Sequence, residues 1–142
     1  MAVLSSETIQ AACAALDGRA VLIESRNPEL RSDLLIQLLD RGAGLVANGR
    51  TICLRESGKL LASPLAGEGG HIEVRGVGII ARDAQERVPV SLVVVLLDSP
   101  PRNPNERRTR TIAGVELPVL ALAAGDPAAA IKVGLALETV TR

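Results

Sequence analysis

Eight consecutive residues, Ser25-Arg26-Asn27-Pro28-Glu29-Leu30-Arg31-Ser32, end like a phosphate-binding loop but lack its glycines. A P-loop has the pattern Gly-x-x-x-x-Gly-Lys-Ser/Thr, and its backbone N–H groups surround the phosphates. Here Ser25 and Leu30 stand at the glycine positions and Arg31 stands at the lysine position, whereas Ser32 keeps the hydroxyl. Arginine retains the positive charge of the lysine but not its geometry.

The middle of this stretch has the residue types of an ordinary helix start. Asn27 is a good N-cap, Pro28 suits the first helical position, and Glu29 is favourable in the first turn. Pro28 also lacks the N–H that a phosphate would need. The Glu29 carboxylate would repel a phosphate by roughly 4 kcal/mol at about 4 Å and an effective dielectric constant of about 20. We therefore expect a capped helix in place of an anion-binding nest.

The flanking residues predict a strand, a loop and a helix in succession. Ala20 to Ile23 form a short apolar run typical of a buried strand. A broad apolar helical face follows, and Gly42 stands where a helix would end. The apolar residues of that face are Leu34, Leu35, Ile36, Leu38 and Leu39.

The composition is that of one soluble domain over residues 1–142. The 16 basic and 16 acidic residues cancel, which argues against a nucleic-acid or membrane-surface binder driven by bulk charge. We find no secretory signal and no apolar stretch that could span a bilayer, so we expect a cytoplasmic protein. Cys13 and Cys53 have no metal-ligand spacing and are predicted to be buried thiols. The chain has no Phe, Tyr or Trp, so an adenine could be held only by aliphatic side chains.

Three segments together resemble the catalytic domain of bacterial HPr kinase/phosphorylase. They are residues 31–42, the Leu45-Val46-Ala47 run, and residues 70–80 with the pattern Glu-x-Arg-Gly-x-Gly-Ile-Ile. The resemblance covers the chain from about Thr8 to the C-terminus and implies a P-loop kinase-like fold. In that family the loop reads GxxGxGKSD, whereas this chain has SRNPELRSD.

The resemblance also implies where catalytic groups would lie. Its first strand would carry a histidine at the position of Gln10, and two aspartates would follow the Leu-Val-Ala run at Asn48 and Gly49. None of these three residues can act as a general base near neutral pH or hold Mg²⁺ as a carboxylate. We therefore assign no catalytic residue and no metal site.

The remaining signature residues are open to two interpretations. Glu73, Arg75, Gly76 and Gly78 either keep a binding role or serve structure. In the structural interpretation the glycines serve backbone geometry and allow close backbone approach, and Arg75 pairs with a nearby carboxylate such as Glu73 or Asp33. We expect His71 to be solvent-exposed. Basic residues 107, 108 and 110 are typical of a solvated loop, but the resemblance gives the pair Glu106-Arg107 a possible role in partner contacts.

Other elements follow from local patterns. Residues 5–16 fit either a helix over 7–15 or, by the resemblance, a strand over 9–16 that ends in an Asp17-Gly18 turn, and we favour the strand. In the middle of the chain we expect strands at 44–47 and 51–54 split by a hairpin-type Asn48-Gly49, then a turn at 57–59, a loop over 63–70 and an extended stretch over 72–80. A buried strand over 90–97, a polar loop over 98–110 and a strand pair over 111–122 should follow. The last element is a helix over 128–139, capped by Asp126 with Pro127 at its first position.

The fold class that we predict is α/β, with a mostly parallel or mixed sheet, the loop–helix unit at one end and a C-terminal helix on one face. By resemblance, the function that we favour is that of a pseudokinase which binds an HPr-like phosphocarrier, a regulatory protein or a second copy of itself, with no cofactor. The alternative is an active kinase that uses ATP and Mg²⁺ through Arg31 and Ser32. A third interpretation is a binding domain with no nucleotide ancestry, which would lack the strand–loop–helix packing.

Overall fold

Strand β9 (Val88–Leu97) is the centre of the fold in this computed structural model, which describes residues 5–101 and 108–140. It pairs in parallel with β3 (Arg19–Ser25) on one edge. On the other edge its first residues pair antiparallel with β6 (Lys59–Pro64) and its last residues pair in parallel with β11 (Val115–Ala123). Its apolar sequence suits this position, because both of its faces are covered.

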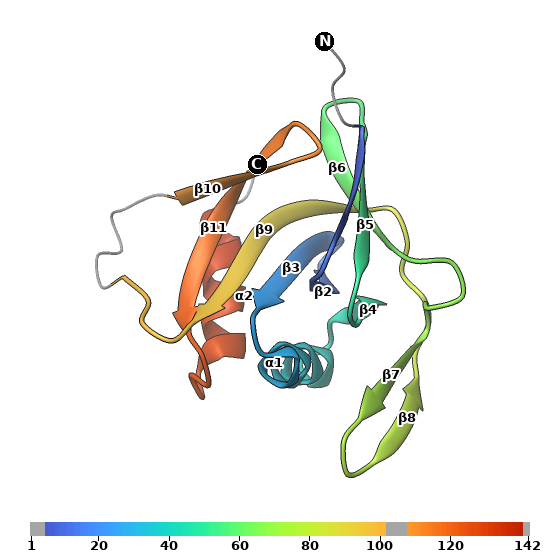
Figure 1. Cartoon of the computed structure of the whole chain (residues 1–142), viewed down its shortest axis with the longest axis vertical. Helices are drawn as coiled ribbons and strands as arrows, with labels where there is room; N and C mark the ends of the chain where they lie inside the picture. Colours follow the sequence, from blue (N-terminus) through green and yellow to red (C-terminus); the bar gives the residue numbers. More distant parts are fainter. Residues whose placement is uncertain (1–4, 102–107, 141–142) are drawn as a thin grey trace.

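The mixed sheet has nine strands, with the path β1-β5-β6-β9-β3-β2-β4 and with β11 and β10 branching from β9 (Figure 1). The strands not yet given bounds are β1 (Ser6–Ile9), β2 (Ala12–Leu16), β4 (Gly44–Ala47), β5 (Thr51–Glu56) and β10 (Arg108–Ile112). A separate two-stranded sheet joins β7 (His71–Val74) and β8 (Gly78–Ala81). The helices are α1 (Pro28–Asp40) and α2 (Ala129–Thr139). The predicted α/β class is confirmed.

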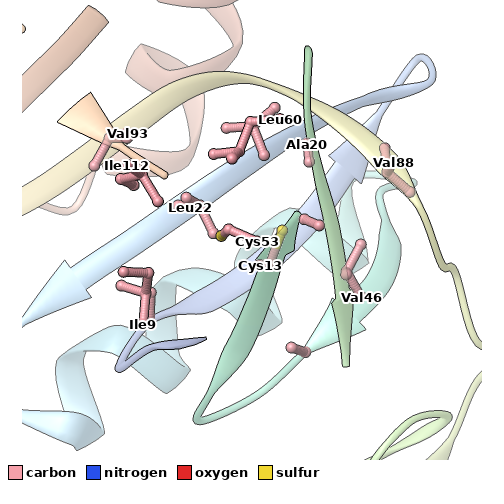
Figure 2. Close-up of a cluster of buried hydrophobic side chains, with 14 of the residues drawn as sticks. Ile9, Cys13, Ala20, Leu22, Val46, Cys53, Leu60, Val88, Val93 and Ile112 are labelled. Carbon is pink, nitrogen blue, oxygen red and sulfur yellow. The ribbon is translucent and has the colours of Figure 1, made fainter. Parts of the chain in front are cut away.

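Two apolar clusters lie on opposite faces of the central strands. Cys13, Leu22 and Val93 point into one cluster, beneath β1, β5 and β6 (Figure 2). Their neighbours Ala14, Ile23 and Val94 point into the other, against α1 and α2. The alternation follows from the period of two along a strand. Strands β1, β5 and β6, the central strands, and the two helices thus form three layers.

The two cysteines are buried and free, as predicted. Both point into the first cluster (Figure 2). Burial raises the pKa of Cys13 well above its usual value, and neighbouring Cys53 adds to the shift. Burial also raises the pKa of Cys53 to about 12. Both thiols are therefore protonated at neutral pH and serve as small apolar side chains.

Helix α1 begins and ends where local sequence predicts. Asn27 is its N-cap and Pro28 is its first residue. At the other end Gly42 has φ of 100°, and its N–H donates to the Leu39 carbonyl while the Ala43 N–H donates to the Leu38 carbonyl. This pair of bonds is a Schellman motif, which needs the left-handed conformation that glycine adopts readily.

Four predicted elements differ from the structure. The favoured strand over 9–16 is confirmed, but it is interrupted at Gln10, so that β1 pairs with β5 and β2 pairs with β3 and β4. Asn48-Gly49 joins no hairpin, since β4 pairs with β2 whereas β5 pairs with β1 and β6. Residues 72–80 form a hairpin instead of one extended stretch. Helix α2 begins at Ala129, with Ala128 at the N-cap position, so Pro127 lies before the helix and not at its first position. Asp126 accepts the Ala128 N–H in the turn before the helix.

The remaining expectations are confirmed with shifted bounds. The 57–59 turn joins β5 to β6, and the strand pair around Gly114 is the β10–β11 hairpin. Residues 108–110, predicted to lie in the polar loop, belong to β10, and residues 102–107 lie outside the described residues. Strand β6 likewise extends to Pro64, into the predicted loop. In the part of the chain that the structure describes, no helix is long and apolar enough to cross a membrane.

Candidate functional site

An open groove of about 920 Å³ lies at the carboxyl ends of the parallel strands β3, β9 and β11. In α/β sheets this edge is the usual place for a ligand. Several segments line the groove, and the lining residues discussed below are Gln10, Glu24, Ser25, Leu30 and Arg31. The groove therefore joins the loop that opens α1 to the end of the central strand.

The N-terminus of α1 is capped by its own chain. The Asn27 Oδ1 accepts the backbone N–H of Glu29 at 2.9 Å, and the Ser25 Oγ accepts that of Asn27 at 3.1 Å. Pro28 has no N–H to offer. Two of the backbone donors that a phosphate-binding loop would direct at its ligand are thus occupied, and a third is absent. This is the capped helix start that the residue types predict.

The Glu29 carboxylate forms an ion pair with Arg75 of the β7–β8 hairpin. Its Oε1 lies 2.6 Å from the Arg75 Nη1, and both side chains are mostly exposed. The predicted Arg75 partners, Glu73 and Asp33, were wrong. The hairpin places Arg75 beside the first turn of α1, where Glu29 is its partner. The ion pair therefore joins the signature segment to the loop that opens α1.

Arg31 faces the groove with part of its guanidinium buried. Within the described residues its Nε has no hydrogen-bond partner. Burial lowers the pKa of Arg31, although an arginine remains charged at neutral pH. An unpaired buried donor on a cation is costly, so Arg31 is the group in this groove best suited to meet an anion.

Ser32 lies beside Asn48, one of the two positions at which the resemblance implies aspartates. The Ser32 Oγ is 3.4 Å from the Asn48 Oδ1, a long contact. Asn48 and Gly49 line a smaller hollow of about 260 Å³ together with His71 and Glu73. A Cβ added to Gly49 would meet no atom within 4 Å, so a larger side chain would fit there. Crowding therefore does not explain the glycine at position 49.

Gln10 lies apart from that hollow. It stands at the break between β1 and β2 and lines the large groove near Ser25, Leu30 and Arg31. His71 is exposed, as predicted. Among the residues that the structure describes, no three His, Cys, Asp or Glu side chains are grouped so that they could hold a metal ion.

The two signature glycines serve the turn of the hairpin. Gly76 has φ of 85° and Gly78 has φ of 121°, a region that residues with a Cβ rarely adopt. A Cβ at either position would meet nothing within 4 Å. The expected close backbone approach at these glycines is therefore wrong, whereas their expected role in backbone geometry is confirmed.

Sequence reasoning missed the ion pair between Glu24 and Arg110, whose charged atoms lie 3.0 Å apart. Burial raises the pKa of Glu24, and Arg110 only partly offsets the shift. No local pattern links these residues, because β10 and β3 are brought together only by the sheet. Arg110 and Arg108 lie on β10 rather than in a solvated loop. The Glu106-Arg107 pair lies outside the described residues.

Comparison with known proteins shows what fold this chain has. No model of a known protein family matches it, and no curated protein matches its sequence. Among solved structures, the Hpr(Ser) kinase/phosphatase from Coxiella burnetii is similar, with a TM-score of 0.80 and 23% sequence identity. The match covers 94% of this chain and 95% of that one. The predicted HPr kinase-like α/β fold is thereby confirmed, and the strand–loop–helix packing that the third interpretation would lack is present.

Proposed function

We propose that this chain is a catalytically degenerate relative of the HPr(Ser) kinase/phosphatases, a pseudokinase that acts by binding a protein. The observation that carries the proposal is the capped start of α1, where Asn27 occupies the Glu29 N–H at 2.9 Å. In a working P-loop the same backbone donors surround the phosphates. To bind here, a nucleotide phosphate would have to displace the Asn27 side chain from the Glu29 N–H. It would also find no N–H donor at Pro28.

The charge at the loop also disfavours a nucleotide. The Glu29 carboxylate lies at the helix N-terminus, where a phosphate would gain from the helix dipole. It is already paired with Arg75 at 2.6 Å. The Glu29 carboxylate thus already neutralises Arg75, the cation of the signature segment. A phosphate arriving there would meet a negative charge that already has its partner.

The positions for proton transfer and metal binding support the same proposal. Asn48 beside Ser32 has the shape of an aspartate without its charge, and Gly49 has no side chain. Gln10 in the groove does not titrate near neutral pH. Phosphoryl transfer depends on a positioned base and on Mg²⁺ held by acidic groups. Loss of one group could be compensated, but the losses lie at three separate places, namely the loop that opens α1, the Asn48-Gly49 pair, and Gln10.

The proposed partner is an HPr-like phosphocarrier or a regulatory protein, in the bacterial cytoplasm. This part of the proposal rests on the name of the similar Coxiella structure, which identifies HPr as the protein on which that enzyme acts. No nucleotide, metal ion, nucleic acid or membrane is needed for such binding.

Isothermal titration calorimetry of ATP, with and without Mg²⁺, tests the loss of nucleotide binding. We expect no heat at millimolar ATP. Micromolar binding that requires Mg²⁺ would overturn the pseudokinase proposal. A matched gain-of-function variant restores the P-loop pattern and should bind ATP if the loop is the cause. Its substitutions are Ser25→Gly, Pro28→Gly, Glu29→Ser, Leu30→Gly and Arg31→Lys.

Titration of a bacterial HPr protein into the same sample tests the partner directly. Binding without ATP supports the proposal, and binding that appears only with ATP and Mg²⁺ contradicts it. Binding of a serine-phosphorylated HPr should be compared with that of the unmodified protein, because Arg31 in the groove offers a cation to a phosphate.

The alternative is an active kinase with a variant loop. It is favoured by the unpartnered Arg31 Nε in the groove and by the Ser32 hydroxyl beside it in sequence. Transfer of labelled phosphate from ATP to HPr would establish it, provided that the Ser32→Ala variant loses the transfer. No transfer at any Mg²⁺ concentration would exclude it for that substrate.

A further inference from the structure

The β7–β8 hairpin lies outside the nine-stranded sheet and has only two strands. In Figure 1 it extends from the body of the molecule, with β7 nearer to α1 and β8 on the far side. Ile72 is buried, and Ile72 and Ile80 pack against the helix-side cluster, which fixes the base of the hairpin. Within the described residues β8 pairs with no strand other than β7. Its outer edge is therefore open.

The open edge is apolar and carries no charge. Residues 76–81 read Gly-Val-Gly-Ile-Ile-Ala, in a chain of which 23% is charged. The Val77 and Ile79 side chains are each 71% exposed, the highest values among the exposed large hydrophobic residues. Natural sheets usually protect an edge strand with a charge, a proline or a bulge. Strand β8 has none of these, and two-stranded ribbons are marginally stable by themselves.

We propose that β8 pairs with β8 of a second copy of this chain, antiparallel about a two-fold axis at Ile79. The two hairpins would form one four-stranded sheet in the order β7-β8-β8-β7. The proposal does not rest on the pseudokinase function, since a nucleotide-binding chain could pair in the same way.

The backbone of β8 is oriented for this register. Arg82 donates its N–H to the Gly70 carbonyl, which fixes the alternation of bonded pairs along the hairpin. Counting from that bond, Ile79 and Ala81 direct their N–H and C=O groups away from β7. A two-fold axis at Ile79 would place the N–H and C=O groups of Ile79 opposite those of Ile79 in the second copy, and the Ala81 N–H opposite the Val77 carbonyl. The Val77 N–H already donates to the Val74 carbonyl at 2.9 Å, so the new bonds would be made by Ile79 and by the Ala81 N–H.

Charge selects a second copy as the occupant. In the register through Ile79, residues whose numbers sum to 158 stand opposite each other. Arg82 then faces an uncharged glycine, Gly76, and Arg75 lies near Asp83 of the second copy, so no like charges meet. The two Ile79 side chains become direct neighbours on one face, a favourable β-branched pair. The pairing partly covers Val77 and Ile79, the most exposed large apolar side chains among the residues that the structure describes.

Sedimentation velocity of the full chain, up to on the order of 1 mM protein, tests the association. Interference optics are needed because the chain has no aromatic residue. We expect a concentration-dependent shift from monomer to dimer that Ile79→Lys abolishes. The matched control is Leu135→Lys on α2, where the side chain is also exposed at 56%, and this variant should still dimerise. A wild type that stays monomeric throughout, or an Ile79→Lys variant that dimerises like the wild type, would overturn the proposal.

A disulfide tests the register. Directly opposite residues of a bonded antiparallel pair have Cα atoms about 5.5 Å apart, within disulfide range. Under mild oxidation Ile79→Cys should therefore give a covalent dimer, while native Cys13 and Cys53 are buried and do not interfere. Leu135→Cys measures cross-linking by random collision. Equal rates of cross-linking for the two variants would contradict the two-fold axis at Ile79.

Discussion

Strand β3 and the start of α1 are only a few residues apart, but they are held by different forces. Val21, Leu22 and Ile23 are completely buried between the two apolar clusters. Asn27 and Glu29 are exposed and are held by one side-chain cap and one ion pair. Apolar burial contributes about 25 cal/mol per Å², whereas an exposed ion pair contributes at most about 1 kcal/mol.

This difference explains how the fold can persist while the loop chemistry changes. Substitutions in the loop cost little stability, because the contacts that they replace are local and solvent-exposed. Substitutions in the sheet disturb the packing that defines the fold. A similar fold therefore indicates similar packing of β3 and β9. It says little about the residues that line the groove at their ends.

The largest effect is expected from a cavity in the sheet. Leu22→Ala should lower the free energy of unfolding by about 2–5 kcal/mol, because the side chain is fully buried. Urea unfolding followed by far-UV circular dichroism measures this, since aromatic fluorescence is lacking. Leu135→Ala on the exposed face of α2 is the control and should change stability by less than about 0.5 kcal/mol. Equal losses would contradict the contrast between the two regions.

The buried thiols give a second test of the sheet. Their raised pKa values mean that the folded chain keeps both protons at pH 9–11, whereas the unfolded chain loses them. This contribution to stability is complete below about pH 8.5 and is lost as the pH rises toward 12, by up to about 1.4 kcal/mol per pH unit and thiol.

A thiol reagent at pH 8 should therefore label neither Cys13 nor Cys53 until urea unfolds the chain. Replacing both with alanine should flatten the alkaline fall in stability relative to the wild type. Rapid labelling of the native protein would show that the first cluster opens locally and that β5 is less firmly packed than the structure indicates.

At the loop, Asn27→Ala should cost about 0.5–2 kcal/mol, because it leaves the Glu29 N–H without its acceptor. Asn27→Ser keeps a capping oxygen and should retain most of the stability. The same urea experiment compares the three proteins. A loss in Asn27→Ala as large as that in Leu22→Ala would show that the helix start contributes to the fold as much as the core does.

The smallest effect is expected from Glu29→Gln, which removes the charge that pairs with Arg75. Exposed ion pairs contribute about 0–1 kcal/mol, and salt screens them. The difference from the wild type should shrink further between low and high salt. Glu68→Gln, which breaks the exposed pair with Arg50, is the matched control. A loss above 2 kcal/mol for Glu29→Gln would mean that the hairpin depends on this contact.

Elements defined by nearby residues could be predicted from sequence. The start of α1 at Asn27-Pro28 and its end at Gly42 depend on caps within a few residues. The burial of β9 follows from its unbroken apolar run. The hairpin at residues 71–81 was missed because glycines are tolerated in an extended stretch as well as in a turn. Only their positive φ values distinguish the two.

By itself the sequence determined the α/β class and the capped start of α1 at Asn27-Pro28. Both depend on residue type and short spacing. Only the tertiary structure decided that Arg75 pairs with Glu29, that Arg110 pairs with Glu24, and that β8 keeps an open edge. These contacts join residues 46 and 86 positions apart, or depend on which strands meet. Strand pairing in the sheet sets such distances, and no local pattern encodes them.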